Sequence, residues 1–144
     1  MFSKSCEYGL RAIIYIAEQS EAQQKVSLPT IAAAINSPQP FTAKILQQLT
    51  RHQLVKSIKG PYGGFEISAD KRAAISLSDV VKVLDGDAIF TRCGLGLSKC
   101  DAASPCPLHF KFVGIKEQLK EVLENTTLQG LLDDDEASLQ WLQI

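Results

Sequence analysis

The chain has 144 residues, 45% of them hydrophobic, which suits one compact domain with an added helix. No apolar run reaches the roughly 20 residues of a membrane span, and the polar N-terminus is unlike a secretory signal, so we expect a cytoplasmic protein without membrane contact. Although the net charge of the chain is only -1, residues 22–65 form a basic segment that contains no acidic residue. Such a segment favours an anionic partner such as DNA, although a solvated basic face would carry the same charge.

Apolar residues at helical spacing predict three helices in the first 52 residues, at 5–19, 28–35 and 40–52. Ser27 is a suitable N-cap for the second helix. The segment at 36–40 is predicted to be a turn, because its two prolines resist a helix interior. The third helix carries an apolar stripe and leaves its polar side chains for another surface.

A short hairpin is predicted to follow these helices. β-Branched residues at 54–59 indicate one strand, the glycine-rich segment 60–64 a tight turn, and residues 65–67 the return strand. Two short helices joined by a turn and followed by a hairpin are in the order of a winged helix-turn-helix. We therefore predict a mainly α fold with a small β-hairpin, in which residues 1–75 form the DNA-binding part.

The second part, residues 76–144, is predicted to hold a helix capped by Ser76 or Ser78, a cysteine-containing loop at 91–107 and a long helix at 108–125. Apolar residues of the long helix are spaced four, three, four and three apart, at Leu108, Phe112, Ile115, Leu119 and Val122. This heptad seam predicts packing against a second copy in a homodimer, the alternative being packing within one subunit.

The DNA-reading residues are predicted from polarity and position. A recognition helix needs short polar or basic side chains at the major groove, where Thr42 could reach a thymine methyl and Gln47 an adenine. The glycine-rich turn of the hairpin has small side chains and a lysine beside it, so it could lie as a wing against the sugar-phosphate backbone or in the minor groove. The alternative is an ordinary hairpin in which Gly63 only meets a positive-φ requirement. The predicted residues are Ser37, Gln39, Thr42, Lys44, Gln47, Arg51, Lys56, Lys59, Pro61, Tyr62 and Gly63.

Three of the four cysteines, Cys93, Cys100 and Cys106, are separated by six and five residues. Zinc sites usually contain tight Cys-x-x-Cys pairs, and none is present. Widely spaced thiolates in a loop rich in glycine and proline suit a larger group, such as an iron–sulfur cluster. Zinc binding, free thiols and inert cysteines remain the alternatives.

Three segments and the cysteine loop closely resemble the Rrf2 family of bacterial winged-helix transcription regulators. The segments are EYGLRA at 7–12, PFTAKILQQL at 40–49 and LVKSIKGPYGGF at 54–65. The resemblance covers nearly the whole chain, and Tyr62 departs from it at a place the family often fills with glycine. It implies a DNA-binding regulator, either a repressor or an activator, that senses redox state, nitric oxide or cluster status through a [2Fe–2S] or [4Fe–4S] cluster.

A cluster normally takes four protein ligands, and the loop supplies three. In the IscR-like branch of the family, the resemblance implies a histidine ligand at His109. In the NsrR-like branch it implies an acidic ligand from the partner subunit at Glu7. The two remain alternatives, with a surface or helix-capping histidine and a solvated glutamate as the simpler interpretations. Cys6 is expected to be a small packed residue.

Two other functions are alternatives to a cluster sensor. The first keeps the fold but replaces the cluster by thiol switching or by a protein partner. The second is an enzyme or electron carrier, which we do not expect because no acid/base pair is evident and His52 and His109 are the only histidines. In a sensor, gain or loss of the cluster would alter the spacing of two wings, with a coupling of roughly 1–3 kcal/mol.

Overall fold

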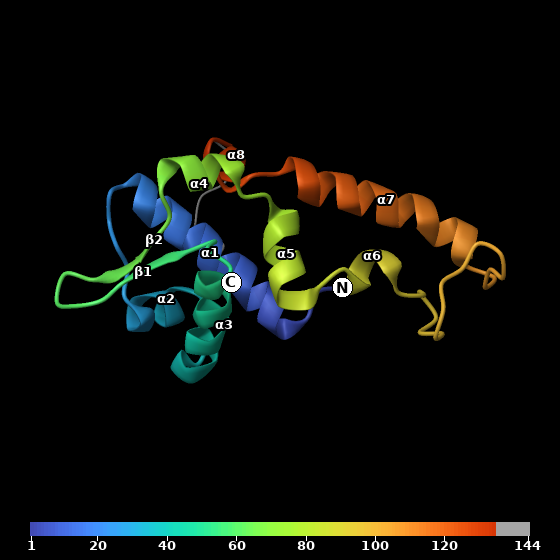
Figure 1. The fold of residues 1–144 in the computed structure, drawn as a ribbon, viewed down its shortest axis with the longest axis horizontal. Coiled ribbons are helices and arrows are strands. Elements are labelled where there is room, and N and C mark those ends of the chain that lie inside the picture. Colours follow the sequence, from blue (N-terminus) through green and yellow to red (C-terminus); the bar gives the residue numbers. More distant parts are fainter. Residues whose placement is uncertain (135–144) are drawn as a thin grey trace.

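The computed structural model describes residues 1–134 and contains eight helices and one two-stranded antiparallel hairpin within that range (Figure 1). The predicted fold class, mainly α with a small hairpin, is confirmed. The elements are α1 (Lys4–Glu21), α2 (Leu28–Ala34), α3 (Gln39–Arg51), β1 (Lys56–Ile58), β2 (Gly64–Glu66), α4 (Ala69–Ala74), α5 (Leu77–Asp85), α6 (Ala88–Thr91), α7 (His109–Asn125) and α8 (Leu128–Leu132). The short helices α4, α6 and α8 were not predicted.

Helix α1 is the central helix of the fold. Ser3 caps it by accepting a hydrogen bond from the backbone N–H of Cys6 at 3.0 Å. Its buried residues recur every three or four positions, so one side faces the core, where α3 and α5 pack against it. At Gly9 an added Cβ would lie 2.1 Å from the Leu84 side chain, so the glycine permits the close approach of α5.

The hairpin is joined to the body through β2. Backbone hydrogen bonds run in both directions between Val26 and Phe65, at 3.2 and 2.8 Å. Its tight turn is closed by the N–H of Gly63, which donates to the carbonyl of Gly60 at 3.0 Å. The positive φ angles fall at Gly60 and Gly64, not at Gly63. The positive-φ explanation of Gly63 was therefore wrong: a Cβ there would lie 2.0 Å from the carbonyl oxygen of Ile58.

The later part of the chain returns to the core built by α1–α3. Ser76 pairs with Thr127 in an isolated bridge, and the N–H of Leu128 donates to the carbonyl of Ile75 at 3.0 Å. Leu128 is only 1% exposed and shares one hydrophobic cluster with residues of α1, α2 and α3. The boundary predicted at residue 75 stays a prediction, and residues 135–144 of its second part lie outside the described residues.

Helix α7 extends away from the body and carries the cysteine loop at its far end, close to α6 (Figure 1). The hairpin projects from the opposite end of the molecule. A signal at the loop must therefore act on the hairpin and α3 through the helices between them or through a second copy. Within residues 1–134, no helix combines the length and the apolar character needed to cross a bilayer.

Candidate DNA interface and cysteine site

Most predicted reading residues of α3 lie on its outer surface. Gln39, Lys44, Gln47 and Arg51 are exposed, which leaves their polar groups available to a ligand. No side chain among the described residues caps the start of α3, and Pro40 has no N–H, so the backbone N–H groups of Gln39 and Phe41 are the ones available to an anion such as phosphate.

Thr42 and Ser37, which were also predicted to read DNA, do not expose their hydroxyl groups. Thr42 is completely buried, and its hydroxyl donates to the carbonyl of Pro38 at 3.0 Å. The prediction that Thr42 contacts a base is wrong, because this hydroxyl is used to support the turn before α3. Ser37 is half-buried, its hydroxyl oxygen has no hydrogen-bond partner among the described residues, and its contact with DNA stays a prediction.

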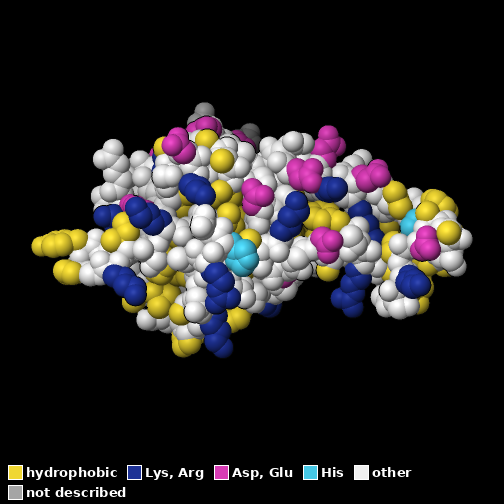
Figure 2. Space-filling model, viewed as in Figure 1, with side chains coloured by type: hydrophobic (Ala, Val, Ile, Leu, Met, Phe, Trp, Pro, Cys, Tyr) yellow, Lys and Arg dark blue, Asp and Glu magenta, His cyan; other side chains and the backbone are white. Residues whose placement is uncertain are grey.

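The outer face of α3 and the hairpin border a groove of about 410 Å³. Gln47 and Arg51 line it from α3, and Ser57 and Phe65 line it from the strands. Figure 2 shows Lys and Arg side chains over α3 and the base of the hairpin, whereas basic and acidic side chains are mixed along α7. Among the described lining residues Arg51 alone is charged, and Leu28 and Ala43 are apolar, so the cations that suit a polyanion lie on the surfaces beside the groove.

The hairpin presents its predicted contact residues outward. Lys56, Lys59, Pro61 and Tyr62 are exposed, and hydrophobic side chains form the far end of the hairpin in Figure 2. Tyr62 is 89% exposed, so the ring that departs from the family pattern is free to meet a partner.

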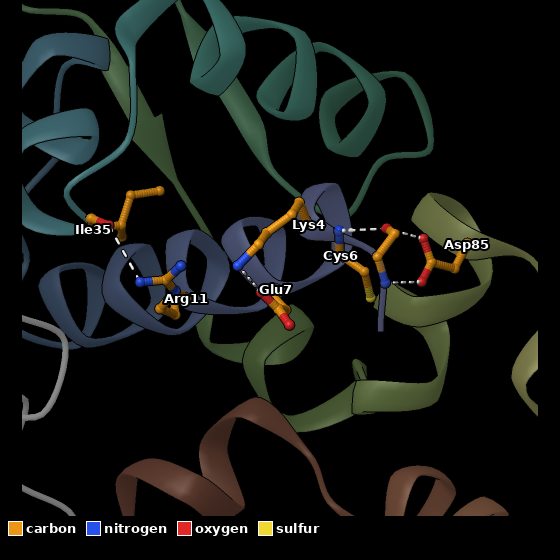
Figure 3. A network of polar contacts seen from close by, with 7 residues as sticks. Lys4, Cys6, Glu7, Arg11, Ile35 and Asp85 are labelled. Atoms are coloured by element: carbon orange, nitrogen blue, oxygen red, sulfur yellow. Dashed lines mark hydrogen bonds and ion pairs between the residues drawn. The ribbon is translucent and has the colours of Figure 1, made fainter. Parts of the chain in front are cut away.

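Two side chains of α1 hold the turn that precedes α3, and this arrangement was missed in the sequence. Arg11 donates to the carbonyl of Ile35 at 3.4 Å (Figure 3). Its guanidinium carbon also lies 4.5 Å from the ring centre of Tyr8. The Tyr8 ring packs edge-on against Phe41 in the first turn of α3, with ring centres 5.5 Å apart. The motif EYGLRA therefore supports the position of α3.

The side chains of the cysteine loop and the start of α7 form two contacting pairs, one of two cysteines and one of a cysteine and a histidine. The Sγ atoms of Cys93 and Cys106 are 3.8 Å apart, and the Sγ atom of Cys100 lies 3.4 Å from Nδ1 of His109. His109 is 9% exposed and begins α7. Among residues 1–134, no three His, Cys, Asp or Glu side chains are placed to hold a single metal ion.

The surroundings of Cys93 favour the thiolate form of its sulfur. The backbone N–H groups of Leu95 and Leu97 donate to Cys93 and, with smaller contributions from Cys106 and Lys116, hold the pKa of its thiol below the usual value despite burial. Lys116 also places its Nζ atom 3.8 Å from the sulfur of Cys100. The role of Lys116 was missed, although its spacing of seven from His109 puts both on one side of α7.

Glu7 lies far from the cysteine loop within one copy of the chain. Its carboxylate is 3.3 Å from the Nζ atom of Lys4, one turn away on α1 (Figure 3). Helix α1 begins near the middle of the molecule, and the loop lies at the far end of α7 (Figure 1). Of the two candidate fourth ligands, only His109 meets a cysteine within one copy.

Cys6 is the packed residue that the sequence predicted. Its side chain is fully buried with Val81 and Leu123, beside the cap of α1 (Figure 3). Burial, followed by the nearby carboxylates of Asp85 and Glu7, raises the pKa of its thiol to about 12. A protonated, buried thiol of this kind is a poor nucleophile and a poor metal ligand.

Some residues of the predicted dimer seam pack within the subunit, and others are exposed. Leu119 packs within the subunit against the cluster that contains Cys6 and Leu123, while Leu108 and Phe112 are half-buried. Ile115 and Val122 remain 57% and 59% exposed. The seam stays a prediction, and its free apolar surface is centred on these two residues.

The donor set of the loop fits an iron–sulfur cluster chemically. Three thiols and one imidazole are soft or borderline donors of the kind that ligate such clusters. Backbone N–H groups already directed at the sulfur of Cys93 are the interaction that stabilises sulfur ligands with negative charge. The two pairs would have to open around the cluster, since the sulfur atoms of Cys93 and Cys106 are now in contact.

Comparisons with known proteins agree on one family. The family model described as Rrf2, iron-dependent transcriptional regulator, matches residues 2–134. An Aquifex aeolicus (strain VF5) protein with the provisional name HTH-type transcriptional regulator is 33% identical over 142 residues, which cover 96% of each chain. The HTH-type transcriptional regulator IscR of Vibrio campbellii is 26% identical, over 90% of this chain and 75% of its own.

A solved structure extends the agreement to the fold. CymR of B. subtilis, described as its global cysteine regulator, superposes with a TM-score of 0.73 at 27% identity, covering 91% of this chain and 95% of its own. The predicted winged helix-turn-helix is confirmed by this likeness. The family match over almost the whole chain is the decisive finding. The chain belongs to the Rrf2 family of iron-dependent transcriptional regulators.

Proposed function

We propose that this regulator reads promoter DNA with α3 and the hairpin, and that Cys93, Cys100, Cys106 and His109 hold an iron–sulfur cluster that controls this binding. The contact between Cys100 and His109, beside the Cys93–Cys106 pair at the start of α7, carries the proposal. The family description as iron-dependent supports it. When bound, a [2Fe–2S] or [4Fe–4S] cluster supplies a centre that reacts with oxidants and nitric oxide.

In the proposed complex, α3 lies in the major groove and the hairpin lies beside it. Gln39 and Gln47 carry amides suited to base edges, while Lys44 and Arg51 carry cations suited to phosphates or guanine. Lys56 and Lys59 contact the backbone, which leaves the exposed tip with Pro61, Tyr62 and Gly63 at the minor groove. Exposure of the glutamine, lysine, Arg51 and Tyr62 side chains supports this arrangement, as does the position of Gln47 and Arg51 on the groove between the two elements.

Replacing Lys56 and Lys59 together by alanine is expected to weaken binding to all DNA sequences alike. Each lost phosphate contact should lower the slope of log affinity against log salt by about 1, hence by about 2 for the pair. The measurement is a salt titration on promoter fragments selected by the wild-type protein. Lys120→Ala on α7 is the matched control, since its side chain is 56% exposed and far from the groove. An unchanged slope in the double variant would contradict the proposed wing contacts.

The cluster is tested on protein purified without oxygen. Iron and sulfide analysis together with the absorption spectrum should detect a cluster in the wild type and none after Cys93, Cys100 and Cys106 are all changed to alanine. The triple variant should also differ from cluster-loaded protein in DNA affinity, by about 5- to 150-fold for a coupling of 1–3 kcal/mol. Equal affinity under all redox conditions would refute cluster control.

A second candidate function uses the same fold with thiols in place of a cluster. The contact between the Cys93 and Cys106 sulfur atoms favours it, as does the likeness to a global cysteine regulator. Colourless, iron-free protein that still changes its DNA affinity on thiol oxidation would establish this candidate. The cluster function predicts coloured protein with bound iron and sulfide.

The regulator is further proposed to act as a homodimer through α7. Ile115 and Val122 offer exposed apolar surface on one side of this helix, and a two-fold DNA site needs a two-fold protein. Changing both to aspartate should halve the mass measured by light scattering and reduce affinity for a two-half-site operator. Ala73→Asp, at an exposed position of α4, is the control and should leave the mass unchanged. A wild-type monomer would exclude the proposed dimer outright.

A further inference from the structure

The Cys93–Cys106 pair has a feature that cluster binding does not require. Their sulfur atoms are already in contact at 3.8 Å, and a disulfide needs about 2.05 Å. The two residues end the loop that runs from α6 to α7, so a small movement of either loop end would close this gap. The intervening residues include Gly96, which has a φ of +74° and donates its N–H to the carbonyl of Cys93 at 2.9 Å, in a tight turn directly after that cysteine.

The remaining thiols are held away from this pair. Cys100 is engaged by Nδ1 of His109 at 3.4 Å and by Nζ of Lys116 at 3.8 Å, on the side of α7. Cys6 is fully buried in the separate cluster with Val81 and Leu123. Four cysteines allow six possible pairs, and among the described residues only Cys93 and Cys106 have their sulfur atoms in contact.

We propose that Cys93 and Cys106 form an intramolecular disulfide when the cluster is absent and a peroxide is present. Cys100 and His109 then remain as a single thiol and a single imidazole, which is too few ligands to hold a cluster. The disulfide thus keeps the protein in its cluster-free state until it is reduced. This regulatory consequence rests on the proposed cluster function, whereas the formation of the disulfide does not.

The chemistry uses hydrogen peroxide as the two-electron oxidant. Cys106 is the more exposed of the pair, so its sulfur attacks one peroxide oxygen, the O–O bond breaks, and a sulfenic acid and one water are formed. The sulfur of Cys93 then attacks the sulfur of Cys106, and the S–O bond breaks to release a second water. The two thiol protons leave in the two waters, the two sulfurs are oxidised, and the peroxide is reduced.

Peptide mapping tests which sulfurs are joined. Protein purified without oxygen is freed of iron with a chelator, treated with hydrogen peroxide, alkylated, and digested with trypsin and a protease that cleaves before aspartate. The expected product links residues 93–99 to residues 101–111, because cleavage after Lys99 and before Asp101 frees Cys100 from both peptides. Alkylated Cys6, alkylated Cys100 in a digest with trypsin alone, and migration as a monomer on a non-reducing gel should accompany it.

Single substitutions provide the controls. Cys93→Ser and Cys106→Ser should each abolish the linked peptide, whereas Cys6→Ala and Cys100→Ser should retain it. A disulfide that contains Cys100, a disulfide between two copies, or four free thiols after the peroxide treatment would each overturn the proposal. Loss of the linked peptide in Cys100→Ser would show that Cys100 reacts first, and would overturn the direct pairing as well.

Reloading the protein with a cluster distinguishes failure of the disulfide proposal from failure of the proposed cluster function. The oxidised protein is given ferrous iron and sulfide without oxygen, with and without a dithiol reductant. Cluster uptake only after reduction is the expected result. If the mapped disulfide forms but the reduced protein also takes up no cluster, the proposed cluster function fails while the disulfide stands. If the oxidised protein loads as well as the reduced protein, the proposed regulatory consequence fails.

Discussion

Replacing His109 by alanine is expected to remove most of the iron from protein purified without oxygen. In the structure its imidazole contacts the sulfur of Cys100 and is almost buried at the start of α7. A lost ligand should weaken cluster binding at least as much as loss of an outer-shell partner, which costs about 10- to 100-fold. The measurement is iron per chain together with the absorption spectrum under limiting iron.

His52 provides the matched control for this substitution. It is the other histidine of the chain, it is exposed, and its Nδ1 atom is 2.9 Å from the carbonyl of Gln48 in α3. His52→Ala should leave iron binding unchanged. The spectrum of residual cluster in His109→Ala should also shift, which loss of a purely structural contact would not cause.

The competing ligand is tested in the same assay. Glu7 is paired with Lys4 and would have to reach the loop of a second copy, so Glu7→Ala should retain the cluster if His109 is the ligand. Full iron content in His109→Ala combined with its loss in Glu7→Ala would instead assign the fourth position to Glu7 of the partner subunit. Together the two variants decide between the alternatives.

Leu128→Ala is expected to produce the largest loss of stability among simple truncations in α8. Leu128 is 1% exposed and belongs to the main hydrophobic cluster, which also contains Ile13 and Ile31. Leucine-to-alanine changes at fully buried positions cost about 2–5 kcal/mol, because they lose transfer free energy and leave a cavity. The measurement is urea unfolding of cluster-free, reduced protein at one fixed concentration.

A second leucine supplies the control for this truncation. Leu97 lies in the cysteine loop and is 54% exposed, so Leu97→Ala should change the free energy of unfolding by less than about 0.5 kcal/mol. Equal stability of Leu128→Ala and Leu97→Ala would contradict the packing of α8 against the core. It would also contradict the proposal that α8 connects the end of α7 to the DNA-binding half.

The sequence by itself was sufficient to predict the main helices, the hairpin and the family. The helices and the hairpin depend on local signals, namely apolar spacing, a serine N-cap at Ser27 and the glycine-rich turn, all of which act within a few residues, whereas the family was predicted from a resemblance. The helices α4, α6 and α8 escaped prediction because each has only four to six residues. Segments that short carry too few periodic positions to be recognised, even where Ser68 or Thr127 provides a cap.

The candidate cysteines could also be identified from their spacing, but their pairing could not. Which sulfur meets which partner depends on the path of the loop and on the direction in which α7 begins, and neither is a local property of the sequence. The same limit applies to Thr42. Its polarity favoured contact with DNA, whereas the tertiary structure buries it and uses its hydroxyl at the carbonyl of Pro38.

The sequence thus determined the elements and the residue types available for DNA and cluster chemistry. Only the tertiary structure decided which of those residues are exposed, that His109 meets Cys100, and that Cys93 meets Cys106. The physical reason is that helix spacing and capping are short-range interactions, whereas burial and side-chain contact follow from the packing of elements distant in the chain. Lys116 illustrates this, since it reaches the backbone of Arg92 across the loop.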